Sequence, residues 1–230
     1  MSVPMLVTFI GNGTSFDVGL KFVEVKSDMS RIAVDVVLLP DETMTDRAIE
    51  INAELVKKFG DEIVLNKANC LPHISLAMGC LEEIDIASVE KVLEEIAKET
   101  SLPYLEIIGI RTSGNSKGQA VSVFEVKKMQ EFQSLHKKVM DKLAPYLTND
   151  VTKDMIYGDV DAALSTLLWI KNYREKSSFE NFFPHITIGY GQTEYQLQPA
   201  TFAASKLALC HLGNHCTCRK ILVSIELKCL

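Results

Sequence analysis

The sequence lacks any apolar run that approaches the ~18 residues needed to cross a lipid bilayer. It also lacks low-complexity tracts and long blocks of charge of one sign, which disfavours a disordered tail. The first residues, 1–17, have neither the basic segment nor the apolar core that is typical of a signal peptide. We therefore expect a cytoplasmic protein that does not enter a membrane.

Basic residues are not in excess, since 24 Lys and Arg stand against 30 Asp and Glu and the formal net charge is −6. Proteins that hold long nucleic acids by the backbone usually carry a basic surface. We therefore expect no extended nucleic-acid track. A small nucleotide or the end of an RNA is a suitable partner, because a cleft can be locally positive in an acidic protein. We also expect a monomer.

A disulfide framework is not expected, because six cysteines without a secretory signal are typical of free thiols. A group of possible zinc ligands lies near the C-terminus: Cys210, His211, His215, Cys216 and Cys218. Their spacing does not match the common paired-cysteine patterns, and neighbours on a predicted hairpin face opposite sides. We expect no metal and no cofactor, and a zinc-dependent structural or nucleic-acid-binding protein is the alternative that these residues leave open.

The chain has 230 residues, of which 47% are hydrophobic, so it can bury a sizeable core. Periodicity predicts helices at 44–59, 84–98, 128–147 and 161–173, and strands at 5–10, 21–26, 32–39, 73–78, 104–111, 120–126, 185–190, 206–212 and 217–227. This order predicts an α+β fold with mostly antiparallel pairing. No long linker divides the chain, so we expect one domain over 1–230 with an N-terminal extension at about 1–30.

Two segments about half a chain length apart share one pattern. Residues 71–76 read Leu-Pro-His-Ile-Ser-Leu, and residues 183–188 read Phe-Pro-His-Ile-Thr-Ile. Residues i and i+2 of a strand point to the same face, so each segment presents one imidazole together with one hydroxyl. The aliphatic residues between them face a core, and proline suits the start of a strand.

Two imidazoles and two hydroxyls suit the cleavage of a phosphodiester. The attacking oxygen must lose a proton and the leaving oxygen must gain one, and imidazole, with a pKa of about 6.5, does either near neutral pH. Hydroxyl groups can donate hydrogen bonds to the non-bridging phosphate oxygens, where charge is stabilised in the transition state. This scheme requires no metal.

The paired motifs, one in each half, resemble those of the two-histidine (2H) phosphoesterase superfamily, over about residues 31–227. The resemblance implies two related lobes, each an antiparallel sheet with outer helices, that face each other across a central cleft. It implies a metal-independent phosphoesterase that acts on a 2′,3′-cyclic phosphate or a related phosphodiester. His73 and His185 would be the acid and base, in either order, and Ser75 and Thr187 would bind the phosphate. A 2′-5′ RNA ligase and an inactive nucleotide-binding module are the alternatives.

Some features depart from that family or are weaker candidates. An arginine often follows the second motif of the family, where this chain has Gly189-Tyr190-Gly191, and the segment 149–181 is long enough to be a lid. Weaker candidates for substrate binding are Lys171, Tyr173, Arg174 and Tyr190. On a regular strand Tyr190 would face the core, although the flanking glycines could bend the strand. We expect His136 to be a packing residue and 113–118 to be a plain hairpin loop.

Overall fold

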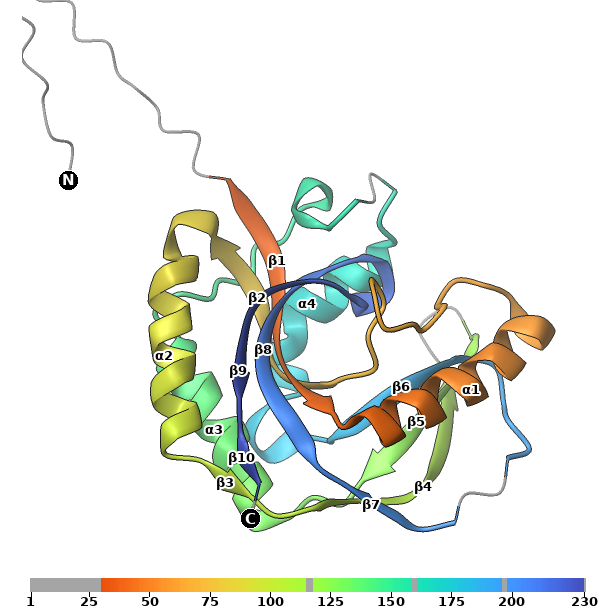
Figure 1. Ribbon diagram of the computed structural model, residues 1–230. Coiled ribbons are helices and arrows are strands. Elements are labelled where there is room, and N and C mark those ends of the chain that lie inside the picture. The colour runs from red at the N-terminus through yellow and green to blue at the C-terminus, as the bar shows by residue number, and fades with distance from the viewer. Residues whose placement is uncertain (1–29, 115–117, 159–160, 196–197, 230) are drawn as a thin grey trace, which may run out of the picture.

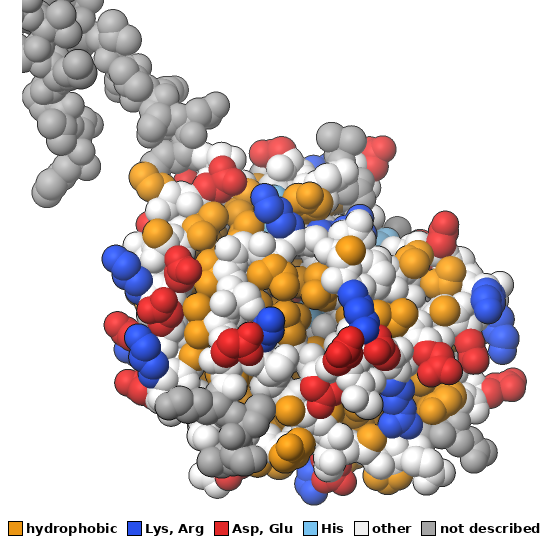
Figure 2. Space-filling model, in the orientation of Figure 1, with side chains coloured by type: hydrophobic (Ala, Val, Ile, Leu, Met, Phe, Trp, Pro, Cys, Tyr) orange, Lys and Arg blue, Asp and Glu red, His pale blue; other side chains and the backbone are white. Residues whose placement is uncertain are grey.

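The computed structural model describes residues 30–114, 118–158, 161–195 and 198–229. The strands predicted at 5–10 and 21–26 and the predicted N-terminal extension lie outside the described residues, as does part of the loop 113–118. Among the described residues, no helix is both long enough and apolar enough to span a bilayer. On the face of the molecule that Figure 2 shows, acidic and basic side chains are interspersed.

The described residues form two four-stranded antiparallel sheets with helices packed on them (Figure 1). The first has the order β2-β1-β8-β9, with β1 (Arg31–Pro40), β2 (Ile74–Glu82), β8 (Ala204–Leu212) and β9 (Cys218–Glu226). The second has the order β6-β5-β4-β7, with β4 (Leu105–Gly114), β5 (Ala120–Val126), β6 (His185–Tyr190) and β7 (Ala200–Phe202). A short parallel pair is formed by β3 (Ser101–Leu102) and β10 (Lys228–Cys229). The predicted α+β class is confirmed.

Two of the helices pack on a different sheet from the one whose strand they follow. The helices are α1 (Glu42–Phe59), α2 (Ile86–Lys98), α3 (Gln130–Leu143) and α4 (Leu164–Lys176), with short 3₁₀ turns η1 (Glu83–Asp85), η2 (Lys153–Met155), η3 (Phe179–Asn181) and η4 (Asn214–Cys216). Helix α1 follows β1 of the first sheet but packs on β6 of the second, whereas α3 follows β5 of the second sheet and packs on β2 of the first. Each sheet therefore packs against a helix that follows a strand of the other sheet.

Helix α1 follows directly from its sequence. The Asp41 side chain caps it by accepting a hydrogen bond from the Met44 N–H at 2.9 Å, and Gly60 ends it with a positive φ of 109°. Its inward face carries Met44, Ala48, Ile51 and Leu55 at the predicted helical spacing, whereas Phe59 at its end is exposed. The second Asp41 oxygen accepts a hydrogen bond from the Ala203 N–H at 2.8 Å, which ties the start of α1 to the entrance of β8.

Several predicted boundaries are wrong. The strand predicted at 73–78 instead begins at Ile74 and continues past Gly79 to Glu82. A Cβ at Gly79 would lie 2.7 Å from the Thr148 carbonyl oxygen, so this glycine allows a close backbone approach within the strand. The third helix ends at Leu143, four residues earlier than predicted, and the fourth begins at Leu164, three residues later than predicted.

Asn52 on α1 connects three segments of the chain and is 1% exposed. Its amide donates to the Ile63 carbonyl at 2.9 Å and to the Ile188 carbonyl at 3.0 Å, and its oxygen accepts from the Leu65 N–H at 2.8 Å. We expect Asn52→Leu to lower the free energy of unfolding by about 3 kcal/mol, because it leaves three buried backbone groups unsatisfied. Urea unfolding measures this loss.

The control for that substitution is Asn172→Leu on α4, where the side chain is half-buried and bonds only within its own helix. We expect a change of less than about 0.5 kcal/mol there. Equal stability of the Asn52→Leu variant and the wild type would show that Asn52 does not hold these segments together.

Candidate active site

The two motif histidines are held in the same way at the entrances of β2 and β6. His73 Nδ1 lies 2.7 Å from the Leu71 carbonyl oxygen, and His185 Nδ1 lies 2.8 Å from the Phe183 carbonyl oxygen. A carbonyl only accepts, so Nδ1 carries the hydrogen in each neutral ring. In both rings Nε2 therefore carries the lone pair and is the nitrogen that can exchange a proton.

The hydroxyl of each motif lies on the same face as its histidine. In the second sheet, His185 is opposite Glu125 and Thr187 is opposite Val123, so the two motif side chains share a face. In the first sheet, Ser75 is opposite Val37 of β1. We call these two surfaces the motif faces of the sheets.

The structure brings the two motifs together. Strands β2 and β6, which belong to different sheets, are in contact. Burial lowers the pKa of His73 to about 4, and the nearby His185 contributes to this lowering. Burial also lowers the pKa of His185. Both imidazoles are therefore neutral at neutral pH, which suits a base but leaves open where an acid obtains its proton.

Asp35 is buried beside His73 and was not predicted from the sequence. It lies on β1, opposite Met78 of β2 and Cys210 of β8, and its side chain is 0% exposed. Its Oδ2 is 3.9 Å from Nε2 of His73. Burial raises the pKa of Asp35 well above its usual value. The signal in the sequence is a lone acid within an otherwise apolar strand, 32–39.

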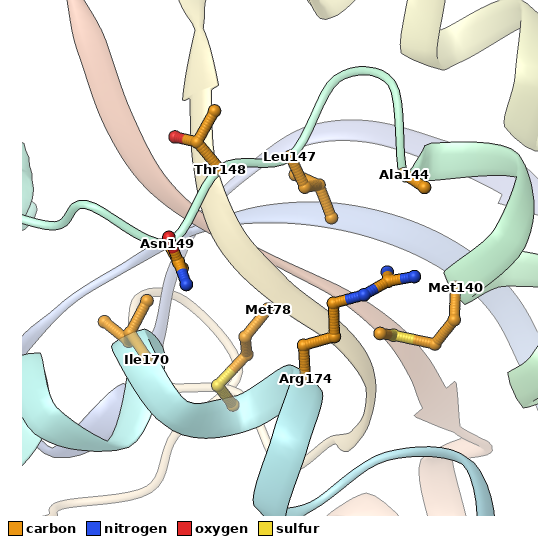
Figure 3. Close-up of a pocket in the computed structure, with 8 residues that line it drawn as sticks. All are labelled: Met78, Met140, Ala144, Leu147, Thr148, Asn149, Ile170 and Arg174. Carbon is orange, nitrogen blue, oxygen red and sulfur yellow. The ribbon is translucent and has the colours of Figure 1, made fainter.

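The three weaker candidates on α4 lie in different places. Tyr173 is 4% exposed, and burial, together with the charge of Asp35, raises its pKa, so its hydroxyl lies near Asp35. Lys171 is exposed. The Arg174 guanidinium lies 5.3 Å from the centre of the Phe179 ring and lines a separate hollow, shown in Figure 3, whose lining includes no histidine.

Tyr190 lies on the motif face because of a bulge. Thr187 is opposite Val123 and Gly189 is opposite Ser122, so Ile188 is the extra residue of β6. The bulge turns Tyr190 to the side of Thr187, away from the core-facing orientation of a regular strand. Its hydroxyl lies 2.8 Å from Nδ1 of His215 in η4, at the turn between β8 and β9 of the first sheet, and so it links the two lobes.

Arg111 is a second residue that the sequence reading missed. It is opposite Val123, so it shares the motif face with Thr187. Its guanidinium pairs with Glu125 at 3.0 Å and lies 4.6 Å from the centre of the Phe183 ring. The strand alternation in 104–111 indicates that Arg111 lies on one face of its strand. It does not indicate which face of the sheet carries His185 and Thr187.

His136 is a packing residue, as predicted. It is 0% exposed on α3, and its ring stacks on Phe182 with a centroid distance of 3.9 Å. Its Nε2 accepts a hydrogen bond from the Phe179 N–H at 2.7 Å. This contact fixes the segment that leads into the second motif.

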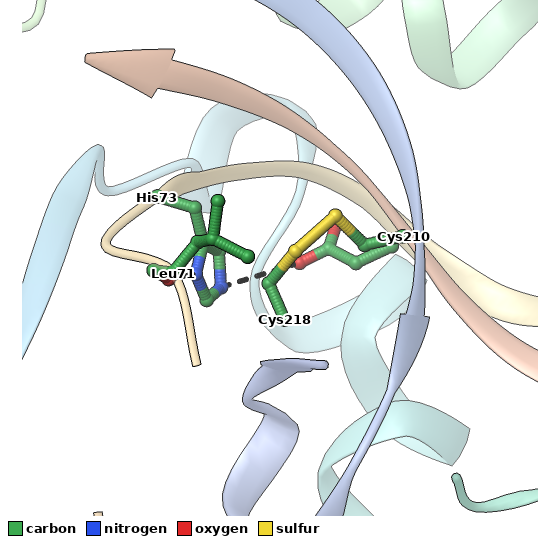
Figure 4. Close-up of a disulfide and its surroundings, with 5 residues drawn as sticks. Leu71, His73, Cys210 and Cys218 are labelled. Atoms are coloured by element: carbon green, nitrogen blue, oxygen red, sulfur yellow. Dashed lines mark hydrogen bonds and ion pairs between the residues drawn. A yellow bond between two sulfur atoms is a disulfide. The ribbon is translucent and has the colours of Figure 1, made fainter. Parts of the chain in front are cut away.

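The prediction that the cysteines are all thiols is wrong, because Cys210 and Cys218 form a disulfide between β8 and β9. Figure 4 shows this bridge together with Leu71 and His73. The Leu71 N–H donates to the Cys218 carbonyl at 3.1 Å, and the Leu71 carbonyl orients His73. The bridge therefore anchors the segment that holds the first histidine, and two of the five possible zinc ligands are in a disulfide.

We expect reduction of this disulfide to lower the free energy of unfolding by about 2.5 kcal/mol, the loop-closure entropy of a short loop. Alkylation with iodoacetamide followed by peptide mass analysis gives the thiol state, and urea unfolding with and without reductant gives the energy. Cys80, a buried thiol, is the internal control for accessibility. Alkylation of Cys210 in the unfolded protein without reductant would contradict the disulfide.

Comparison with known proteins gives one family and several structures. Residues 58–212, which include both motifs, match the model of the 2′-5′ RNA ligase superfamily. No curated protein matches the chain. TT0787 of Thermus thermophilus is 13% identical with a TM-score of 0.47, over 85% of this chain and 98% of that one.

Escherichia coli LigT is also among the similar solved structures. Its apo form is 13% identical with a TM-score of 0.44, over 86% of this chain and 98% of that one. Its complex with 3′-AMP is 14% identical with a TM-score of 0.43, over 85% and 97%. At these TM-scores the family assignment depends on the sequence match alone.

Proposed function

Because the chain belongs to the 2′-5′ RNA ligase superfamily, we propose that it is a phosphoesterase that needs no metal ion. The proposed substrate is a 2′,3′-cyclic phosphate or a related phosphodiester of a nucleotide or an RNA end. The match confirms the superfamily that the paired motifs predicted. The observation that supports the proposed chemistry is the common orientation of His73 and His185, each held through Nδ1 by the carbonyl two residues before it.

In this proposal the two Nε2 atoms move the protons. One imidazole takes a proton from the attacking water, and the other gives a proton to the oxygen that leaves phosphorus. Both rings are neutral in the free protein, so each is ready to accept, and the donor must gain its proton before the bond breaks. Burial supports this function, because little water competes for the proton.

Two hydroxyls and a cation are proposed to bind the phosphate. Ser75 and Thr187 lie on the motif faces and are half-buried, so they can donate to the non-bridging oxygens without being fully solvated. Arg111 lies in the same row as Thr187, and its guanidinium has N–H donors beyond the two that bind Glu125, which can donate to a phosphate oxygen. The acidic net charge of the whole chain favours a small substrate over a long nucleic acid.

The test is hydrolysis of the four nucleoside 2′,3′-cyclic phosphates by the wild type, with and without EDTA. We expect turnover of at least one of them and no loss of rate with EDTA. Loss of activity with EDTA that returns with a divalent cation would contradict a metal-free mechanism. Binding without turnover would instead identify a nucleotide-binding module, and sealing of RNA ends would identify the ligase direction.

A further inference from the structure

Asp35 lies within the strand next to His73, and the proposed proton transfers do not use it. Its side chain is 0% exposed, and neither carboxylate oxygen has a hydrogen-bond partner among the described residues. The Ser75 hydroxyl and the Ala77 N–H face it and partly offset the effect of burial on its pKa. Burial of a carboxyl group that these two groups stabilise only in part is costly. A purely structural role therefore does not account for Asp35.

The position of Asp35 connects it to the reacting nitrogen. Its Oδ2 lies 3.9 Å from Nε2 of His73, a distance of charge interaction that is too long for a hydrogen bond. Nδ1 of this ring is engaged with the Leu71 carbonyl. Asp35 therefore lies beside the one nitrogen of His73 that can exchange a proton with a substrate.

Other titratable groups face Asp35 from the neighbouring elements. Tyr173 on α4 and Cys216 in η4 both have pKa values raised by burial and, to a lesser degree, by the charge of Asp35. Both therefore stay neutral at neutral pH. Cys210 on β8 is in the disulfide and does not titrate. Among these groups, only His73 can become a cation that balances the Asp35 carboxylate.

The second histidine has a different neighbour. Glu125 is the acid opposite His185, and it already forms an ion pair with Arg111, with contacts of 3.0 and 3.2 Å. Its charge is therefore balanced without His185. The two imidazoles are alike in how they are held but differ in the carboxyl group beside them.

We propose that Asp35 is a positioning residue that holds one proton in common with His73, so that His73 enters the reaction as the proton donor and His185 as the base. This inference rests on the proposed function. The proton is on Asp35 when His73 is neutral, and it is on His73 when the Asp35 carboxylate stabilises the imidazolium. Two groups that interact in this way titrate as a pair.

In one turnover, each of the two histidines transfers one proton. His185 Nε2 takes a proton from water as the water oxygen forms a bond to phosphorus. The bond from phosphorus to the leaving ribose oxygen breaks, and that oxygen takes the proton from His73 Nε2. The pair of Asp35 and His73 is then one proton short and His185 has one extra, so one proton must return through solvent before the next turnover.

The raised pKa of Asp35 makes the folded protein less stable as the pH rises. The pKa of Asp35 is raised in the folded protein, so its contribution to stability is complete below the unfolded pKa of about 3.9. The contribution is lost as the pH rises toward the folded value. Asp35→Asn removes this loss, so we expect the variant to be at least as stable as the wild type at pH 8. A loss of activity is then not a loss of fold.

The test combines a pH profile with NMR. In Asp35→Asn we expect the pH midpoint of the His73 ring nitrogens to fall by at least one unit, a tenfold lower proton affinity. We expect kcat/KM to fall at least tenfold at pH 8, because the proton donor of the variant holds its proton less tightly. The control is Asp61→Asn, an exposed carboxyl group, which should match the wild type in both.

Two outcomes overturn the proposal. One is an unchanged His73 midpoint together with an unchanged pH profile in Asp35→Asn. The other, measured on the wild type alone, is a carboxyl carbon of Asp35 that does not titrate together with the nitrogens of His73. These NMR measurements need no turnover. If the wild type hydrolyses no cyclic phosphate, the proposed function fails, while the titration still decides whether Asp35 and His73 share a proton.

Discussion

Replacement of either His73 or His185 by alanine is expected to lower kcat/KM for a nucleoside 2′,3′-cyclic phosphate by about 10²–10⁴-fold, the range for loss of a general acid or base. The reason is geometric, since each ring presents Nε2 while a carbonyl fixes Nδ1. Initial rates at substrate concentrations well below KM measure the loss. The double variant should lose little more than the worse single variant, because the two residues act as one unit.

The matched control is His211→Ala. His211 lies on the face of β8 opposite to Cys210 and Asp35, and its ring bonds to the Met155 carbonyl at 2.9 Å. Its removal should leave kcat/KM within about twofold of the wild type, because it lies on neither motif face. A single histidine variant with wild-type activity and an intact fold would remove that histidine from the chemistry.

Loss of the two motif hydroxyls is expected to have the second largest effect. We expect Ser75→Ala and Thr187→Val each to lower kcat by about 10²–10³-fold, the range for removal of one donor to a developing oxyanion. The effect should be greater on kcat than on KM, because the hydrogen bond strengthens as charge develops on the phosphate. Steady-state kinetics on the cyclic phosphate separate the two constants.

Replacement of Thr187 by serine tests whether the hydroxyl group itself is needed. Thr187→Ser keeps the hydroxyl, so it should retain activity within about tenfold of the wild type, unlike Thr187→Val. Ser88→Ala, which removes an exposed hydroxyl on α2, is the control for the loss of a serine. An equal effect of Thr187→Ser and Thr187→Val would indicate that shape, rather than hydrogen bonding, matters at this position.

Local patterns explain how much of the fold could be predicted. The apolar run of β1 and the helical spacing of α1 each specify their own conformation, so both elements were predicted within a few residues. The paired motifs could be placed on strands for the same reason. The short strands β3, β7 and β10 were missed, because two or three residues carry no periodic signal.

Features set by distant contacts could not be predicted. The predicted strand 73–78 stops before Gly79, but this glycine lies within β2 and allows the close approach of Thr148, far along the chain. The position of Tyr190 depends on a bulge that is defined only by pairing with β5. The disulfide between Cys210 and Cys218 depends on the register of β8 and β9, and composition alone favoured thiols.

The site was predictable where the chemistry repeats and not where it occurs once. His73, Ser75, His185 and Thr187 could be proposed as site residues because two copies of one pattern share a spacing. Asp35 has no second copy, and a single acid in an apolar strand does not indicate which residue it contacts. Only the folded chain shows that it lies 3.9 Å from a motif histidine.

The most direct measurement is hydrolysis of a 2′,3′-cyclic phosphate in ¹⁸O-labelled water with EDTA, followed by ³¹P NMR of the product. For the wild type we expect one regioisomer of the phosphomonoester, with one labelled oxygen on phosphorus, because one histidine activates water on a fixed side of the substrate. The variant that lacks both His73 and His185 should give only the uncatalysed rate. Labelled product formed at the wild-type rate by that double variant would contradict paired-histidine catalysis.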